Sequence, residues 1–338
     1  MTNFRERFLA ELERHLPQED GGLDWRSHVD CALSRLGVQD EAPQAGAQIA
    51  TDPTLQSGDQ VSETIIAYRD PFTVPASVQL QGGVYAEHRV ELGRNSSVQG
   101  DLVADSLLIG GGPQSTFRHI VARTLRFDSA PAIVSGNIWC DRPLWRSQKA
   151  ELVPQLTVRG VVMVQKSAGE PLLVHSRAMF GGLIAPDAIQ TEAHCQIGHL
   201  YSDGELTVGR DNRLGRVEGA SVTVPHDATV TALISTQGDV AVHGTTTCDT
   251  IRARGNVLLG PHVTVTGPVI VAETGTFRIP HGDGWHSKRD HWFYELPDGT
   301  LRPVVGGDDR PSGSRQIALQ ALNHALWQQI NELRGAVA

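Results

Sequence analysis

"LGRNSSVQGDLV" at residues 92–103 and "LGPHVTVTGPVI" at residues 259–270 are two versions of one twelve-residue phrase. Both carry Leu, Gly, Val and Gly at the same offsets and end on an apolar pair. The core of the phrase, apolar-x-Gly-x-x-apolar, recurs through the middle of the chain, with central glycines at 82, 100, 136, 160, 181, 219, 244 and 267. Gly82 and Gly100 stand 18 residues apart, and Gly136 and Gly160 stand 24 apart. A unit of this length predicts one coil of a β-solenoid rather than a helical repeat.

In such a solenoid each coil stacks on the next at strand spacing, about 4.8 Å. Apolar side chains point inward and alternate with outward polar ones, and glycine takes corners where backbones approach closely. The residues around the repeat glycines are therefore the predicted core: Val98, Leu102, Val134, Ile138, Val217, Val222, Val265 and Val269.

Five regions follow from the pattern along the chain. Residues 1–37 predict a helical hairpin, since Phe4, Phe8, Leu12 and Leu16 recur every four residues. Residues 38–60 read as a linker and 61–280 as the solenoid, with 141–157 as an inserted loop or a joint between two blocks. Residues 281–311 contain Pro297-Asp298-Gly299, which indicates a hairpin that caps the last coil. Residues 312–338 predict an amphipathic helix, so the expected class is an all-β parallel solenoid with flanking α-helices at both termini.

Composition excludes several classes of function. The net charge of −9 over 338 residues argues against a general nucleic-acid binder. The four cysteines show no metal-type spacing, which favours a reducing compartment. The N-terminus lacks the apolar core of a signal peptide, and no run is long enough to span a membrane. We therefore expect a cytoplasmic protein, with contact between the N-terminal apolar face and a membrane surface as an alternative to a protein partner.

The stretches "LGRNSSVQGDLVADSLLIGG", "FGGLIAPDAIQTEAHCQIG" and "LGPHVTVTGPVIVAETGTF" resemble the bactofilins, a bacterial family. The resemblance implies a compact right-handed β-helix that needs no nucleotide and polymerises end to end as a cytoskeleton-like scaffold. It also implies recruitment of envelope-acting or shape-determining partners. A solenoid that stays a monomer or closed dimer and docks partners through its helices is the alternative. The candidate residues for self-association are Phe72, Val74, Phe277, Ile279, Leu322, Leu326 and Ile330.

Two catalytic or ligand-binding alternatives compete with the scaffold. A hexapeptide-repeat acyltransferase trimer would use a histidine, and eight of them lie in or near the coils: His88, His119, His175, His194, His199, His226, His243 and His262. The six-residue repeat, however, fails after LGRNSS-VQGDLV. A β-helical protein that binds a carbohydrate or other ligand on one flat face is the other alternative.

Metal binding has one candidate segment. In HGDGWHSKRDHW, the candidates His281, His286 and His291 stand five residues apart, with Asp283 or Asp290 as further Zn ligands. That spacing places them on one face of neither a helix nor a strand, so we expect a polar, aromatic-packed cap instead. No cofactor and no catalytic residue are predicted.

Overall fold

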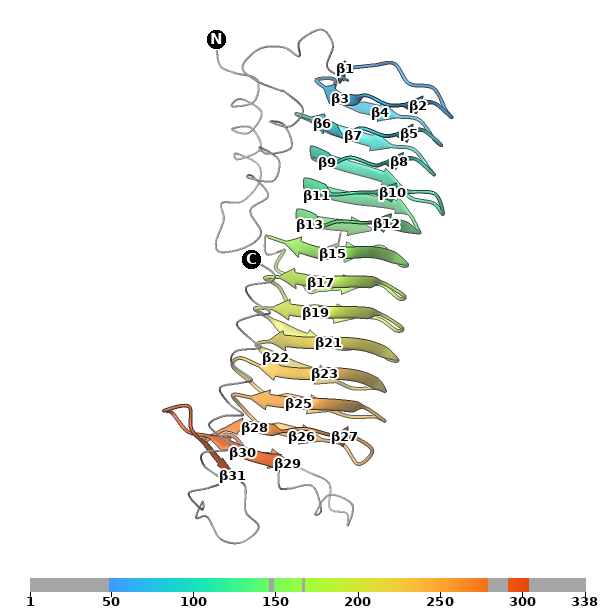
Figure 1. Ribbon diagram of the computed structural model, residues 1–338. Helices are drawn as coiled ribbons and strands as arrows, with labels where there is room; N and C mark the ends of the chain where they lie inside the picture. The colour runs from blue at the N-terminus through green and yellow to red at the C-terminus, as the bar shows by residue number, and fades with distance from the viewer. Residues whose placement is uncertain (1–48, 146–148, 166–167, 279–290, 304–338) are drawn as a thin grey trace. The chain divides into compact units, whose positions relative to one another are not determined.

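The computed structural model describes residues 49–145, 149–165, 168–278 and 291–303. The chain divides into two compact units, residues 1–186 (unit 1) and 187–338 (unit 2). In both, the strands stack in parallel as successive rungs (Figure 1). The predicted parallel solenoid is thus confirmed, with about 12 turns where about ten were expected. The helices predicted over 1–37 and 312–338 lie outside the described residues.

Every coil contributes short strands to three faces, which we name A, B and C. In unit 1 the strands are β1 (Ile49–Thr51), β2 (Gln60–Val61), β3 (Thr64–Ala67), β4 (Phe72–Val74), β5 (Gln79–Leu80), β6 (Val84–Ala86), β7 (Arg89–Leu92), β8 (Ser97–Val98), β9 (Leu102–Gly110), β10 (Thr116–Phe117), β11 (Ile120–Ser129), β12 (Ala132–Val134), β13 (Ile138–Trp145), β14 (Glu151–Leu152), β15 (Leu156–Val164), β16 (Leu172–Val174) and β17 (Met179–Ala185). Face A begins with β1, β3 and β6, face B with β4 and β7, and face C with β2, β5 and β8.

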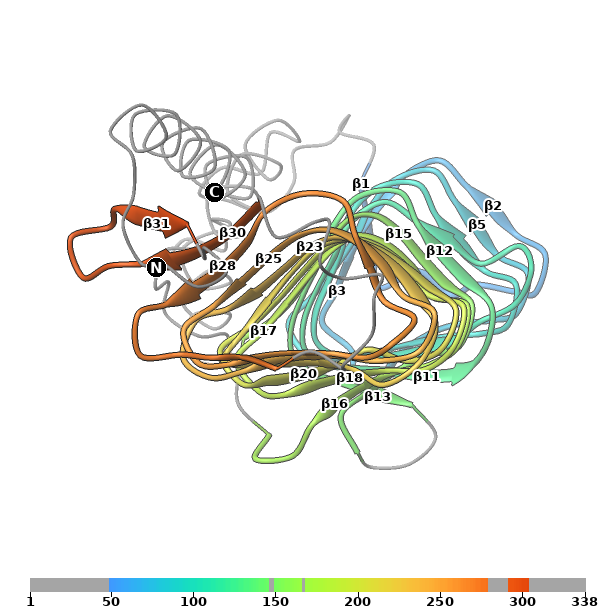
Figure 2. The same cartoon turned by 90° about the horizontal axis from the view of Figure 1, so that it is seen from below.

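Unit 2 repeats this plan. Its strands are β18 (Ile189–Thr191), β19 (Gln196–Ser202), β20 (Glu205–Thr207), β21 (Asn212–Gly219), β22 (Ser221–Val224), β23 (Ala228–Ser235), β24 (Val240–Val242), β25 (Thr247–Ala253), β26 (Val257–Leu259), β27 (Thr264–Val265), β28 (Val269–Ala272), β29 (Phe277–Arg278), β30 (Trp292–Glu295) and β31 (Leu301–Pro303). The view from below shows β23, β25 and β28 following one another on the same side of the coil (Figure 2).

Register explains the repeat length. In unit 1, Val84, Leu102, Ile120 and Ile138 are aligned one above another at steps of 18 residues. The next partner, Val162, comes 24 residues after Ile138. The stack therefore continues across residues 141–157, which form an enlarged coil rather than a joint between two blocks.

Close approach of coils explains the glycines. The Gly100 N–H donates to the Gly82 carbonyl at 3.3 Å, and a Cβ on Gly100 would lie 2.5 Å from the Gly83 nitrogen. Arg118 holds the equivalent place one coil later, where the Gly136 N–H donates to its carbonyl at 2.7 Å. Gly219, opposite Ser235 in the β21–β23 ladder, and Gly244, at φ 64°, lie at other positions of the coil.

All eight predicted core residues are buried. They lie on all three faces, because each coil turns its apolar residues toward one interior. The first strands, β1 and β2, fall inside the stretch predicted as a linker over 38–60. Strands of two or three residues carry too little alternation to reveal themselves in a sequence.

The C-terminal end of unit 2 departs from the parallel plan. β30 continues the ladder of β28, and β31 then pairs with β30 in antiparallel fashion. The predicted turn at 297–299 joins them: Gly299 adopts φ 80°, and the Leu296 N–H donates to the Thr300 carbonyl at 2.9 Å. Figure 2 shows this hairpin projecting from the coil.

Candidate functional site

Face A of unit 1 carries an outward-directed row of apolar side chains. In each coil, two inward residues such as Leu102 and Ala104 flank one residue that points away from the interior, here Val103. These outward residues are aligned in register from strand to strand. We name them the outer row: Ile66, Tyr85, Val103, Val121, Trp139, Met163 and Ile184.

The outer row is buried although it points outward. Val103 and Val121 have no exposed surface, and only Ile184 is of intermediate exposure. Outward positions of a solenoid wall are ordinarily polar, because they face water. A row of apolar side chains here is therefore a surface built to be covered.

Polar residues border the outer row on one side. The Asn137 N–H donates to His119 Nδ1 at 3.0 Å, and the His119 ring lies 5.7 Å from that of Trp139. The hydroxyl of Tyr85 lies 3.4 Å from Asp101 Oδ2, and burial, with Asp101 as the second cause, raises the pKa of Tyr85 above its usual range. These groups hold adjacent coils together, which gives His119 a structural role.

Charges border the other side. Arg123 Nε lies 2.8 Å from Asp105 Oδ1, and Asp141 is buried. An apolar stripe one side chain wide between polar borders matches the apolar face of an amphipathic helix. Such a stripe binds a partner segment; it does not by itself perform chemistry.

The equivalent row of unit 2 is mixed: Tyr201, Glu218, Ile234, Arg252, Ile270 and Phe293. Its charged members are paired. Arg252 contacts Glu295 through two hydrogen bonds of 2.5 and 3.1 Å, and both side chains are buried. Ile270 and Phe293 pack with Leu301 of β31, so the hairpin covers this end of the row.

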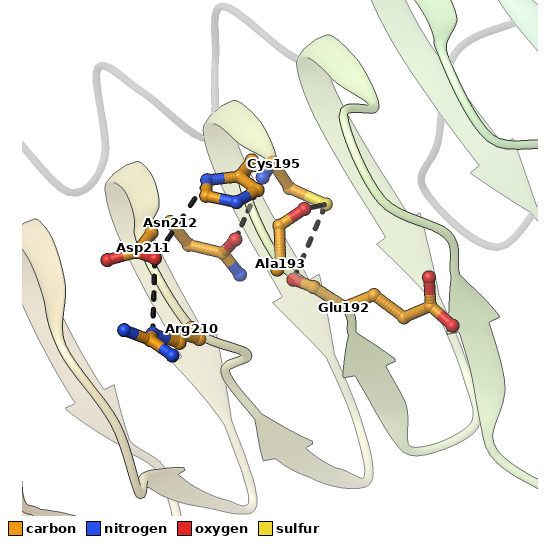
Figure 3. Close-up of polar contacts among 7 residues, drawn as sticks. Glu192, Ala193, Cys195, Arg210, Asp211 and Asn212 are labelled. Atoms are coloured by element: carbon orange, nitrogen blue, oxygen red, sulfur yellow. Dashed lines mark hydrogen bonds and ion pairs between the residues drawn. The ribbon is translucent and has the colours of Figure 1, made fainter.

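The HCQIGH stretch, residues 194–199, forms a corner of a coil. His194 has φ 62°, in the left-handed region, and its Nδ1 lies 4.0 Å from Asp211, which occupies the same corner one coil later at φ 55°. Cys195 is buried, and its N–H donates to Asn212 Oδ1 at 2.8 Å (Figure 3). This corner stacks residues to stabilise the turn.

His199 lies beyond that corner, in β19 opposite Arg216. Burial and then Arg216 lower its pKa. Its neighbours therefore favour the neutral imidazole, which is a poor partner for any anion.

Within the described ranges, the pair most like a catalytic one is His175 and Glu151, with Nε2 3.2 Å from Oε2. The Trp145 ring meets the His175 ring edge-on at 6.5 Å. Glu151 belongs to β14 and His175 follows β16, its ladder partner, so the contact also ties two coils together. No nucleophile is shown within hydrogen-bonding reach of this histidine among those residues.

The predicted self-association and metal residues separate. Phe72 and Val74 are buried in face B of the first coils, and Phe277 stacks on Trp292 at 5.1 Å. His291 is exposed, and the described part of the chain has no group of three metal-ligating side chains. The remaining candidates lie outside the described residues: Ile279, His281, His286, Leu322, Leu326 and Ile330.

Sequence reasoning missed the outer row. Its signal is an apolar triplet on successive coils, such as "VYA" at 84–86, "LVA" at 102–104 and "IVA" at 120–122. A strand that faces water on one side should alternate, whereas these triplets are apolar on both sides.

No protein-family model, curated protein or solved structure matches the chain. Across the residues that the structure describes, no helix has the length and apolar character needed to cross a membrane. The fold and the outer row are therefore the grounds on which a function is argued.

Proposed function

We propose that this protein is a non-enzymatic scaffold, bactofilin-like in plan, that associates with itself through the ends of its solenoid and docks protein partners. The observation that carries the proposal is the state of the first coil. β2 pairs only with β5 and β4 only with β7 among the described strands, so their other edges have no described partner. An open parallel edge is a template for another strand.

The open edge can be assigned to particular backbone groups. Gln79 and Gln81 donate to the carbonyls of Asp59 and Val61, so the peptide groups of Gln60 between them point to the other side. The Gly93 N–H donates to the Val74 carbonyl at 2.8 Å, which leaves the groups of Thr73 on the open edge in the same way. Both side chains are exposed.

At the other end, β27 pairs only with β25 and β29 only with β26 among the described strands. Addition of the first coil of one copy to the last coil of another would be a heterologous contact, which generates filaments. The hairpin β30–β31 occupies only face A there, so faces B and C supply the joining edges.

The test is negative-stain electron microscopy with light scattering on the full chain. The double variant Gln60→Pro/Thr73→Pro removes the two outward N–H groups, and Gln60→Ala/Thr73→Ala is its matched control because it keeps them. We expect filaments or large oligomers from the parent and the alanine control, and their loss from the proline variant at an unchanged melting temperature. A parent that stays monomeric at all concentrations would refute self-association.

A further inference from the structure

The cover of the outer row of unit 1 must come from the chain itself, since the burial of Val103 and Val121 is that of a single chain. The described strands of unit 1 all belong to the wall of the solenoid. None of them lies over the row that their own outward side chains form. The covering segment therefore belongs to another part of this chain.

The connection at β1 indicates which part. β1 pairs with β3, and Thr51 is aligned with Ile66, so Thr51 is the next position along the outer row. The 48 residues that precede Ile49 therefore join the solenoid on face A, at the end of the row itself. No crossing of a solenoid edge is needed for them to reach it.

Those residues carry an apolar pattern of the right size. The outer row spans six steps of strand spacing, about 29 Å. The predicted helices over residues 4–16 and 24–36 would each measure about 20 Å. Their apolar faces carry Phe4, Phe8, Leu12 and Leu16 in the first and Trp25, Val29, Leu33 and Leu36 in the second.

We propose that residues 1–37 dock on the outer row of unit 1 and are its cover. The apolar residues of this segment contact Tyr85, Val103, Val121 and Trp139, and its charged residues meet the polar borders. The scaffold's most apolar face is then occupied by its own N-terminal segment, and a partner that binds there must displace it. This proposal does not depend on filament formation.

The test measures thiol labelling of the full chain. Cys31→Ser removes the cysteine of the N-terminal segment, and Val103→Cys places a probe in the outer row; Cys140, Cys195 and Cys248 are buried. Ile133→Cys on β12 is the exposed control, since Ile133 keeps 38% of its surface. We expect a maleimide to label position 103 on the order of 100-fold more slowly than position 133, because labelling requires local opening.

Substitutions in the segment then decide what provides the protection. Phe8→Glu/Leu12→Glu places charges on the predicted apolar face and should raise labelling at position 103 at least tenfold. Ala10→Glu/Arg14→Glu, on the opposite side of the predicted helix, is the matched control and should leave labelling unchanged. Labelling at position 133 should be the same in every variant.

Three results would overturn the proposal. Rapid labelling of Val103→Cys in the parent would mean that the row is open, and protection insensitive to Phe8→Glu/Leu12→Glu would mean that another segment covers it. Protection lost on dilution would assign the cover to a second copy. If Val103→Cys changes the circular dichroism spectrum, Val121→Cys reports on the same row.

Discussion

Replacing Gly100 with alanine tests the reason for the repeated glycine. A Cβ at this position would lie 2.5 Å from the Gly83 nitrogen and 2.7 Å from the Gly82 carbonyl carbon, both in the backbone of the preceding coil. Backbone atoms cannot rotate away as a side chain can. The two coils would have to separate locally by about 0.5–0.9 Å to restore a tolerable contact.

The cost follows from what such a separation disturbs. Gly100 and Gln99 donate to the preceding coil at 3.3 and 2.8 Å, and weakening two such bonds costs about 1–3 kcal/mol. Overpacking adds about 1–3 kcal/mol. The reduced freedom of alanine in the unfolded chain returns about 0.4–1 kcal/mol. A net loss of about 3 kcal/mol should lower the melting temperature of unit 1 by roughly 6–12 °C.

The assay is thermal melting by circular dichroism, together with hydrogen exchange of peptides covering residues 98–104. The matched control is Gly238→Ala, whose Cβ would lie 3.3 Å from the Ser221 Cβ and 3.5 Å from the Ala220 carbonyl oxygen. We expect the control to change the melting temperature by less than about 2 °C. Equal effects of the two substitutions would refute the argument from close approach.

Four further outcomes are expected. Val265→Asp buries an unpaired charge and should abolish the β-sheet signal of unit 2 in circular dichroism; a soluble variant with unchanged melting would contradict the register. Glu295→Gln removes the buried carboxylate from Arg252 and should cost about 3–5 kcal/mol, seen as faster hydrogen exchange in β30 and β31; unchanged exchange would show the pair to be neutral. Because the folded pKa of His199 lies below its unfolded value, stability should fall as pH drops through about 6.5, and His199→Gln should flatten this slope in pH-dependent melting. Burial raises the pKa of Cys248 to about 12, so mass spectrometry should find it unalkylated at pH 8 until denaturant is added.

The glycine phrase and the alternation around it were sufficient to predict the parallel solenoid. They succeed because each coil must place an apolar residue inward at the same distance from a tight corner, as Val98 and Leu102 do on either side of Gly100. The prediction weakened where a coil departs from the phrase without leaving the stack. Arg118 replaces the glycine of its coil, yet the Gly136 N–H still donates to its carbonyl.

The site was less accessible to sequence reasoning. An outward apolar residue such as Val121 looks like one more core residue until the register shows which way it points. The histidines were conspicuous in the sequence, but His194 occupies a turn and His175 pairs with one carboxylate. Proximity between coils depends on register, and a register that shifts from 18 to 24 residues is not readable from one chain.

The enlarged coil between Ile138 and Val162 has a consequence for how this architecture tolerates change. Six more residues than in the preceding step are accommodated, yet Ile138, Trp139 and Cys140 still face Val162, Met163 and Val164 without a slip. Length is thus decoupled from alignment at the β13–β15 corner, since strands on either side are fixed by their neighbours above and below. A foreign peptide, such as an epitope or a protease site, inserted near Ala150 should be displayed there without cost to the stack.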